Sequence, residues 1–155
     1  MAAELGLTIA GFGHLEDMLK RAIFALERAG LDGNIHERDF RAWLGRMDHV
    51  AADSLGTLID RLDRALTRAR HPDQDLKAQL DEVKGWRNLL CHAAWKPLAG
   101  GDWQPAFMNT AGEVFDGTLA VEELRAIRAM TLDSARRAAR VIHAIEEGST
   151  WPAGE

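Results

Sequence analysis

Apolar residues recur every three or four positions in four long segments of this 155-residue chain. This spacing gathers them along one side of an α-helix, where they can be buried against other helices. The segments cover residues 4–29, 34–66, 72–96 and 119–147. Four long amphipathic helices joined mostly by short connections predict an all-α protein, folded as an antiparallel up-and-down four-helix bundle.

Glycine and proline indicate where these helices begin and end. Gly30 and Gly33 follow the first segment and are predicted to end it. The helix is predicted to begin near Glu4, although three early glycines weaken helix before about residue 12, unless they permit close approach to a neighbouring helix. These three are Gly6, Gly11 and Gly13.

The second and third segments have their own boundary signals. The second is predicted as one continuous helix about 45 Å long that begins at Asn34 as its cap. Pro72 suits the first position of the third helix, and Pro97 disfavours helix in the residue before it.

Residues 98–118 interrupt the helical pattern. The runs "WQPAFM" and "EVF" flank "NTAG", which predicts a β-hairpin of short strands lying against the bundle. Pro105 cannot donate a backbone hydrogen bond, so its strand is predicted to lie at an edge. The prediction is therefore a single domain over residues 1–148 with a short hairpin between the third and fourth helices, followed by a flexible tail over 149–155.

The charge and cysteine content narrow the classes of function. The 19 Lys and Arg residues are outnumbered by 24 Asp and Glu, giving a formal net charge of −5. This balance excludes the broad basic surface of a general duplex-DNA binder, but not a local arginine pocket for one or two phosphates. No run of about 18 uncharged apolar residues could span a membrane. Cys91 is the one cysteine, so we expect a cytoplasmic protein without disulfides.

The stretch "WRNLLCHAAW", residues 86–95, carries the polar residues that the helical pattern does not explain. Arg87 falls at the edge of the apolar side of the third helix, while Asn88 and His92 lie four positions apart and share another side. A buried unpaired guanidinium is too costly, so Arg87 must meet a carboxylate, a cleft or solvent. The sequence therefore predicts a polar cleft at a helix–helix contact.

Structural explanations of the same residues remain open. Arg87 can pair with a carboxylate to stabilise the helix end, with His92 packed between subunits. Gly85 and Trp95 on the outer side of this helix indicate a second packing surface, for the hairpin or for a second subunit. Trp95 and Trp103 are predicted to stack on a base, with core or interface packing as the alternative.

A metal site is a weaker possibility. Three histidines on different helices each lie near a carboxylate, but no Glu-X-X-His repeat of the kind seen in di-metal bundles occurs, so we expect neither a metal nor another cofactor. These histidines are His14, His49 and His143. Cys91 is predicted to fill space as a small apolar side chain rather than to act as a nucleophile.

The run "RNLLCH" resembles the Arg-X4–6-His motif of HEPN (higher eukaryotes and prokaryotes nucleotide-binding) domains, in which a polar residue typically follows the arginine. The resemblance implies an all-α bundle that forms a homodimer, with two motifs lining one cleft. It also implies a metal-independent endoribonuclease of the toxin or defence type, often with an antitoxin partner. Other members are non-catalytic dimerisation or ligand-binding modules, so the motif alone leaves catalysis open.

The resemblance assigns a role to each residue of the motif. Arg87 would stabilise the charge on the scissile phosphate, because a guanidinium is a fixed fork of donors. His92 would move the proton of the 2′-hydroxyl or of the leaving 5′-oxygen, since imidazole titrates near neutral pH. Asn88 would orient one of these two groups.

Overall fold

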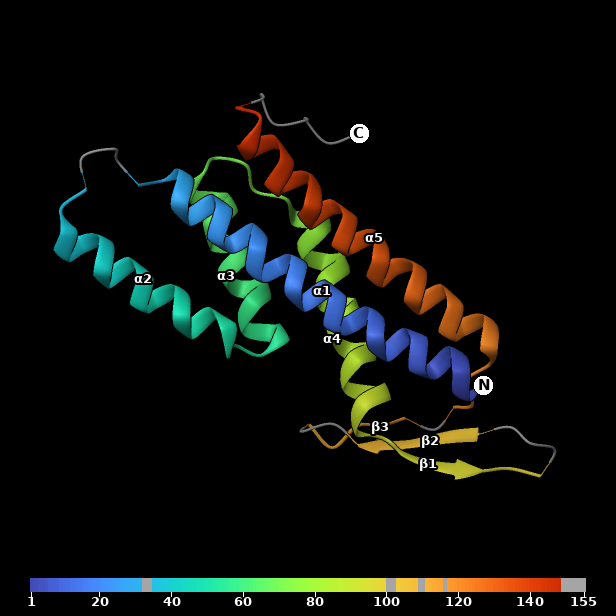
Figure 1. Ribbon diagram of the computed structural model, residues 1–155. Coiled ribbons are helices and arrows are strands. Elements are labelled where there is room, and N and C mark those ends of the chain that lie inside the picture. Colours follow the sequence, from blue (N-terminus) through green and yellow to red (C-terminus); the bar gives the residue numbers. More distant parts are fainter. Residues whose placement is uncertain (32–34, 100–102, 109–110, 116, 149–155) are drawn as a thin grey trace.

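The computed structural model describes residues 1–31, 35–99, 103–108, 111–115 and 117–148, which form five helices and three short strands (Figure 1). The helices are α1 (Ala2–Ala29), α2 (Glu37–Ala51), α3 (Leu55–Arg68), α4 (Gln74–His92) and α5 (Val121–Glu146). The strands are β1 (Ala94–Pro97), β2 (Trp103–Met108) and β3 (Val114–Phe115). In the part of the chain that is described, no helix has the length and apolar character needed to cross a membrane. The tail predicted over 149–155 lies outside the described residues.

The second predicted helix is in fact two helices, α2 and α3, and the prediction of one continuous helix is wrong. Ser54 caps α3, because its hydroxyl accepts a hydrogen bond from the Thr57 amide. Beside it, Asp53 pairs with Arg61 at 2.6 Å. These polar contacts hold a turn over residues 52–54 that reverses the chain direction. Asn34 lies outside the described residues, and His36 is the residue that precedes α2.

The chain reversal between α2 and α3 makes α1 and α5 run in the same direction (Figure 1). The Thr8 hydroxyl donates to the Leu124 carbonyl at 3.3 Å, and a Cβ added to Gly11 would touch Thr131 at 3.7 Å. The antiparallel order predicted for a four-helix bundle therefore does not hold for this pair. Small buried side chains bring the two helices close together, and α1 begins at Ala2, two residues before the predicted start near Glu4.

Four helices, α1, α3, α4 and α5, enclose one hydrophobic core of mostly leucine side chains. Helix α2 lies beside α1, and Val50 is its one side chain in this core. Its Trp43 is only 2% exposed and packs against Phe24 of α1, with ring centroids 5.2 Å apart. Phe40 and Leu44, which were predicted to belong to the buried stripe, are exposed instead. The helix is thus held mainly by a single large side chain.

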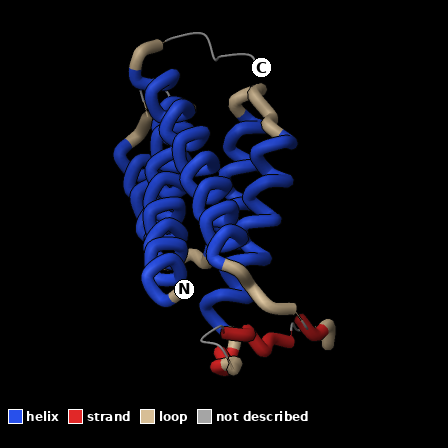
Figure 2. Tube along the Cα trace, turned by 90° about the vertical axis from the view of Figure 1, so that its right-hand side faces the viewer, coloured by secondary structure: helices blue, strands red, loops and turns tan. Residues whose placement is uncertain are grey.

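The strands form a three-stranded antiparallel sheet at one end of the helices (Figure 2). Strands β2 and β3 pair antiparallel in the region of the predicted hairpin, but as part of a three-stranded sheet rather than a lone hairpin. Strand β1 was predicted as helix, and α4 ends at His92 rather than at residue 96. Pro105 lies in the middle strand, opposite Trp95, so its predicted edge position is wrong. Since β3 pairs with Phe107 and Met108 alone, no third strand lies beside Pro105 among the residues that the structure describes.

Asp73 joins the start of α4 to α5, and its removal tests that connection. Its carboxylate accepts from the Leu76 amide at 2.8 Å and from Arg137 at 2.8 and 2.9 Å. We expect Asp73→Ala to lower the free energy of unfolding by about 1–3 kcal/mol, because the helix cap and a charged hydrogen bond are both lost. Asp73→Asn should cost less, since the amide oxygen can still accept from Leu76.

Urea denaturation of both variants measures this difference. The matched control is Asp75→Ala, which removes an exposed carboxylate from the same first turn without removing the cap. Equal losses from Asp73→Ala and Asp75→Ala would contradict the assigned role.

Candidate functional site

Arg87 and His92 meet at the end of α4. The Arg87 Nη1 atom lies 3.4 Å from His92 Nε2 and 3.5 Å from the Asn88 Oδ1 atom. A guanidinium can only donate, so a hydrogen bond in this contact requires His92 Nε2 to accept. The structure therefore brings together the three motif residues that were predicted as a site.

Glu16 of α1 is the nearest acidic partner of the motif. Its Oε1 atom lies 3.8 Å from Arg87 Nη2, which is an ion pair too long for a hydrogen bond. The Arg87 side chain is 32% exposed and that of Glu16 25% exposed. The guanidinium at the edge of the apolar side thus meets both a carboxylate and solvent. Sequence reasoning did not connect Glu16 with Arg87, because their contact depends on how α1 packs against α4.

Buried residues next to the motif hold its polar side chains at the surface of the α4 C-terminus. Leu89 and Leu90 are buried in the core, and the chain leaves the helix at Ala93, whose backbone is extended. The Trp95 indole donates to the Leu90 carbonyl at 3.4 Å, which satisfies one of the acceptors left free at a helix C-terminus. Apolar anchoring on one side therefore fixes the polar residues on the other.

The two tryptophans predicted to bind substrate lie at different places on the sheet. Trp95 is half-buried, packs against the core and supports the end of α4. Trp103 pairs with Pro97 at the far end of the ladder, about 10 Å along the strand from Ala94. It is 39% exposed, so part of its ring remains accessible. Stacking of a base on either ring stays a prediction.

The outer side of α4 is open in the part of the chain that is described. Gly85, Asn88 and His92 follow one another on this side at helical spacing, and no atom lies within 4 Å of a Cβ added to Gly85. Cys91 is also exposed, so its predicted role as a buried filler is wrong. The hairpin therefore does not cover this second packing surface, and the surface is available to another molecule.

Paired charges lie farther along the same open side. Asp81 accepts from Lys84 at 2.6 Å and from Lys77 at 3.0 Å. The hydrogen bond from Lys84 lowers the pKa of Asp81, and the hydrogen bond to Asp81 raises the pKa of Lys77. Since the pKa of the carboxyl falls on folding, its stabilising contribution is present above the ordinary aspartate value of about 4 and is lost in more acidic solution.

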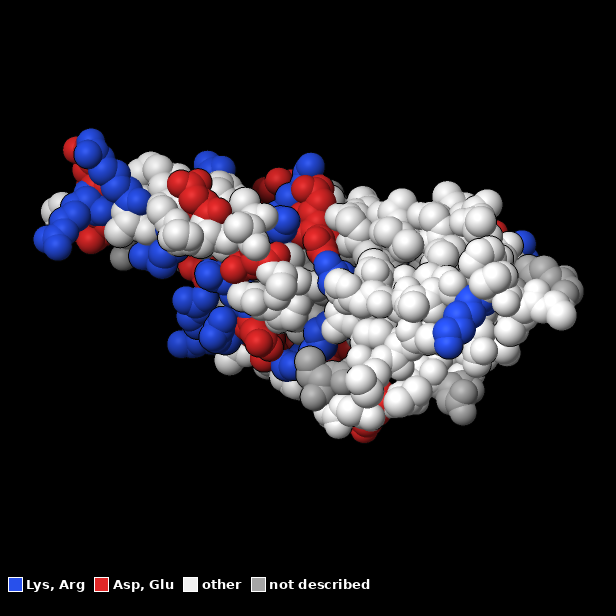
Figure 3. Space-filling view, turned by 90° about the horizontal axis from the view of Figure 1, so that it is seen from below, with Lys and Arg blue, Asp and Glu red and all other residues white. Residues whose placement is uncertain are grey.

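The sheet next to the motif presents a surface with little charge. Seen from below, the molecule carries few charged side chains over the sheet and many over α2 (Figure 3). Met108 and Val114 pair across β2 and β3 and are each 66% exposed. Because β1 follows α4 after Ala93 alone, this apolar surface borders the end of the helix that carries His92.

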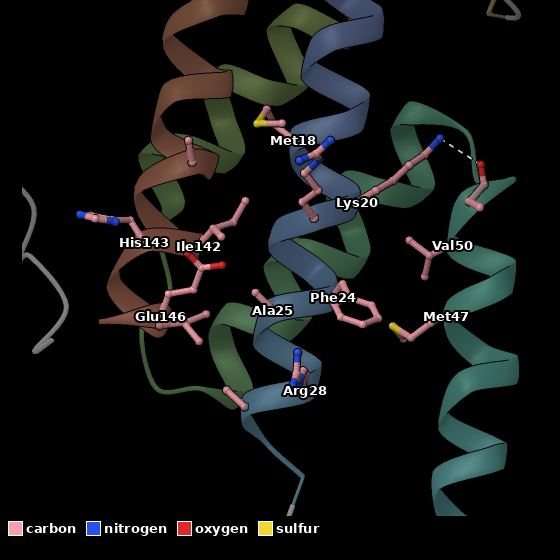
Figure 4. A pocket seen from close by; sticks show the side chains of 15 residues that line it. Met18, Lys20, Phe24, Ala25, Arg28, Met47, Val50, Ile142, His143 and Glu146 are labelled. Atoms are coloured by element: carbon pink, nitrogen blue, oxygen red, sulfur yellow. Dashed lines mark hydrogen bonds between the residues drawn. The ribbon is translucent and has the colours of Figure 1, made fainter. Parts of the chain in front are cut away.

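A large hollow lies elsewhere, between α1, α2 and α5, and measures about 960 Å³. Figure 4 shows Phe24 facing Met47 across it, while Lys20 reaches over to the Ala51 carbonyl at 2.9 Å. His143 at its margin is bonded to Glu147 at 3.1 Å. This hollow is mainly apolar, and it contains no acid–base pair comparable to Arg87 and His92.

Among the residues that the structure describes, no group of three His, Cys, Asp or Glu side chains could hold a metal ion. Comparison of the chain with protein-family models, with curated proteins and with solved structures gave no match. The residues of the site define its chemistry: the Arg87 guanidinium, the His92 imidazole 3.4 Å from it, and the neighbouring Asn88 amide.

Proposed function

We propose that this protein is a cytoplasmic HEPN-like endoribonuclease of the toxin or defence type, which cleaves RNA without a metal ion. The contact between Arg87 Nη1 and His92 Nε2, at 3.4 Å, carries the proposal. It sets a phosphate-binding group and a proton-transfer group side by side, with part of the arginine side chain open to solvent. The HEPN-like bundle in this proposal consists of α1, α3, α4 and α5, with α2 as an addition and the sheet as an insert.

The reaction needs only the substrate's own nucleophile. His92 Nε2 takes the proton of a ribose 2′-hydroxyl, whose oxygen attacks the adjacent phosphorus. The bond from phosphorus to the 5′-oxygen breaks, leaving a 2′,3′-cyclic phosphate, and the departing 5′-oxygen takes up a proton. Arg87 stabilises the charge that grows on the phosphate oxygens, and Asn88 holds the guanidinium in place.

The test uses purified protein and a single-stranded RNA. We expect fragments that end in 2′,3′-cyclic phosphate and 5′-hydroxyl groups, at a rate that a chelator does not change. Expression of the protein in a bacterial host should stop growth, and an antitoxin partner should relieve the arrest. Fragments with 3′-hydroxyl ends, or cleavage that requires a divalent metal, would contradict the proposed reaction.

We also propose that the protein acts as a homodimer in which two copies of α4 pack through the open side at Gly85. A glycine allows close approach of a second helix, and the polar pair Asn88 and His92 on the same side would then line a shared cleft. The surface over the sheet, which carries little charge, also supports a contact between two protomers, because exposed apolar patches commonly mark protein interfaces.

Replacement of Gly85 by arginine tests the homodimer. Nothing lies within 4 Å of this position, and arginine is a better helix former than glycine by about 1 kcal/mol, so the protomer should stay folded. We expect Gly85→Arg to be monomeric in light scattering at micromolar concentration, with most of the RNA cleavage lost. The matched control is Gly45→Arg in α2, where the space is also open. A variant that remains dimeric, or a monomeric wild type, would contradict the proposal.

A second candidate function is a non-catalytic interaction module whose motif is structural. The ion pair between Arg87 and Glu16 favours it, because this pair links α4 to α1 within one chain. In that case His92 would contact a partner surface and would transfer no proton.

A further inference from the structure

We propose that the cleft between α1 and α5 binds phosphates of the single-stranded RNA substrate. This inference rests on the proposed ribonuclease function and assigns a place where the strand is held away from the motif. The cleft has a volume of about 500 Å³, and four basic side chains line it: His14, Arg125, Arg128 and Arg136.

The two helices assemble this cluster because they run parallel and in contact. Arg125, Arg128 and Arg136 are separated by three and eight residues, so they lie along one side of α5. Helix α1 packs beside that side and adds His14. A row of guanidinium groups along a helix matches the repeated charge of a nucleic-acid backbone.

The cluster keeps a positive charge despite the acidic chain. Glu4 lies between Arg125 and Arg128, at 3.3 and 3.4 Å, and so offers one carboxylate to two guanidinium groups. Exposed Glu122 makes a longer pair with Arg125 at 3.8 Å. Arg136 pairs with no carboxylate among the described residues. Since each guanidinium carries five N–H groups, most donors in the cleft remain free for phosphate oxygens.

The floor of the cleft is apolar, and most of its side chains are short. Leu7 is 51% exposed, and Ala10 and Ala129 add only methyl groups. An apolar floor between basic side chains suits a ribose or the face of a base between two phosphates. Because no Phe, Tyr or Trp side chain is among the residues that line the cleft, we expect binding to depend on the backbone and to show little sequence preference.

The cleft and the motif lie on opposite flanks of α1. His14 faces the cleft and Glu16, two positions later, contacts Arg87. Two steps of 100° turn these side chains about 200° apart. The outward ridge between them carries Gly6, Ala10 and Gly13, all exposed. A strand that crosses this ridge at Gly6, Ala10 and Gly13 would pass short side chains between the two sites. Exposed Asp17, which pairs with Arg21 at 2.8 Å, lies one turn beyond Gly13 and bounds this path.

The experiment measures binding separately from cleavage. The probe is a single-stranded 2′-O-methyl RNA, which lacks the nucleophile, and fluorescence anisotropy is recorded at several salt concentrations. We expect the double variant Arg125→Gln/Arg136→Gln to bind the RNA at least about tenfold more weakly than the wild type. The salt dependence of its binding should fall by the equivalent of one to two phosphate contacts. Glu4→Gln should bind more tightly, because it frees Arg125 and Arg128.

The matched control is Arg38→Gln, which removes an exposed arginine from α2. Its binding should change less than that of a cleft variant. The inference is overturned if the double variant binds like the wild type, if Glu4→Gln binds no tighter, or if duplex DNA of equal length binds equally well. Failure of the ribonuclease would look different: wild type and His92→Ala would then cleave natural RNA alike, whatever the binding data show.

Discussion

We expect His92→Ala to reduce the rate of RNA cleavage by the purified protein by about 10²- to 10⁴-fold. The imidazole is the proton-transfer group of the proposed reaction, and no other described histidine lies against Arg87. The rate is measured with a labelled single-stranded RNA, and growth after induced expression gives a second readout. Both effects should appear together, because cleavage of RNA is the proposed cause of growth arrest.

The stability of the same variant separates catalysis from a structural role. His92 is exposed, so its removal should change the free energy of unfolding by no more than about 0.5 kcal/mol. The matched control is His49→Ala, which removes an exposed histidine from α2 and should cleave RNA at the wild-type rate. If the wild type cleaves no RNA and His92→Ala melts at a clearly lower temperature, the interaction module is the correct function. Unchanged cleavage by His92→Ala would exclude the motif as the active site.

Truncation of Trp43 to alanine releases α2 from the rest of the molecule. The indole is buried between Phe24 and Phe40, and removing so large a buried side chain costs about 3–5 kcal/mol. Because Trp43 lies outside the main core, we expect the loss to be local. Amide hydrogen exchange should accelerate throughout α2, while the amides of α1 and α5 stay protected.

Trp43→Phe is the matched control for this prediction. The indole N–H is buried without a hydrogen-bond partner among the described residues, so phenylalanine keeps most of the contact and removes an unsatisfied donor. Its cost should stay below about 1.5 kcal/mol. Equal acceleration of exchange in α1 and α5 in the alanine variant would show that α2 belongs to the cooperative core.

Apolar periodicity identified the helical segments but could not place every boundary. The stripe continues from Val50 to Leu55 and Leu58 across the turn, so spacing alone gives no sign that the chain reverses there. The signal was local, in the Ser54 hydroxyl that caps α3. Strand β1 was missed for another reason: four residues form a strand here only because β2 pairs with them.

The candidate site shows the same division between local and tertiary information. Arg87 and His92 lie five positions apart, so their contact at a helix end could be proposed from the sequence. The carboxylate of Glu16 could not, because it arrives from α1 through the packing of two helices. The cleft at Arg136 depends on the parallel pairing of α1 and α5, which required knowledge that the chain reverses between α2 and α3.

Parallel packing of α1 and α5 also aligns their helix macrodipoles. The two positive ends lie together beside the sheet and together amount to about one elementary charge, whereas antiparallel neighbours would cancel. Glu4 in the first turn of α1, and Glu122 and Glu123 in that of α5, offset this unfavourable alignment. The protein's own carboxylates thus occupy the anion-attracting pole that the two backbones create, and dissolved electrolyte should weaken this interaction.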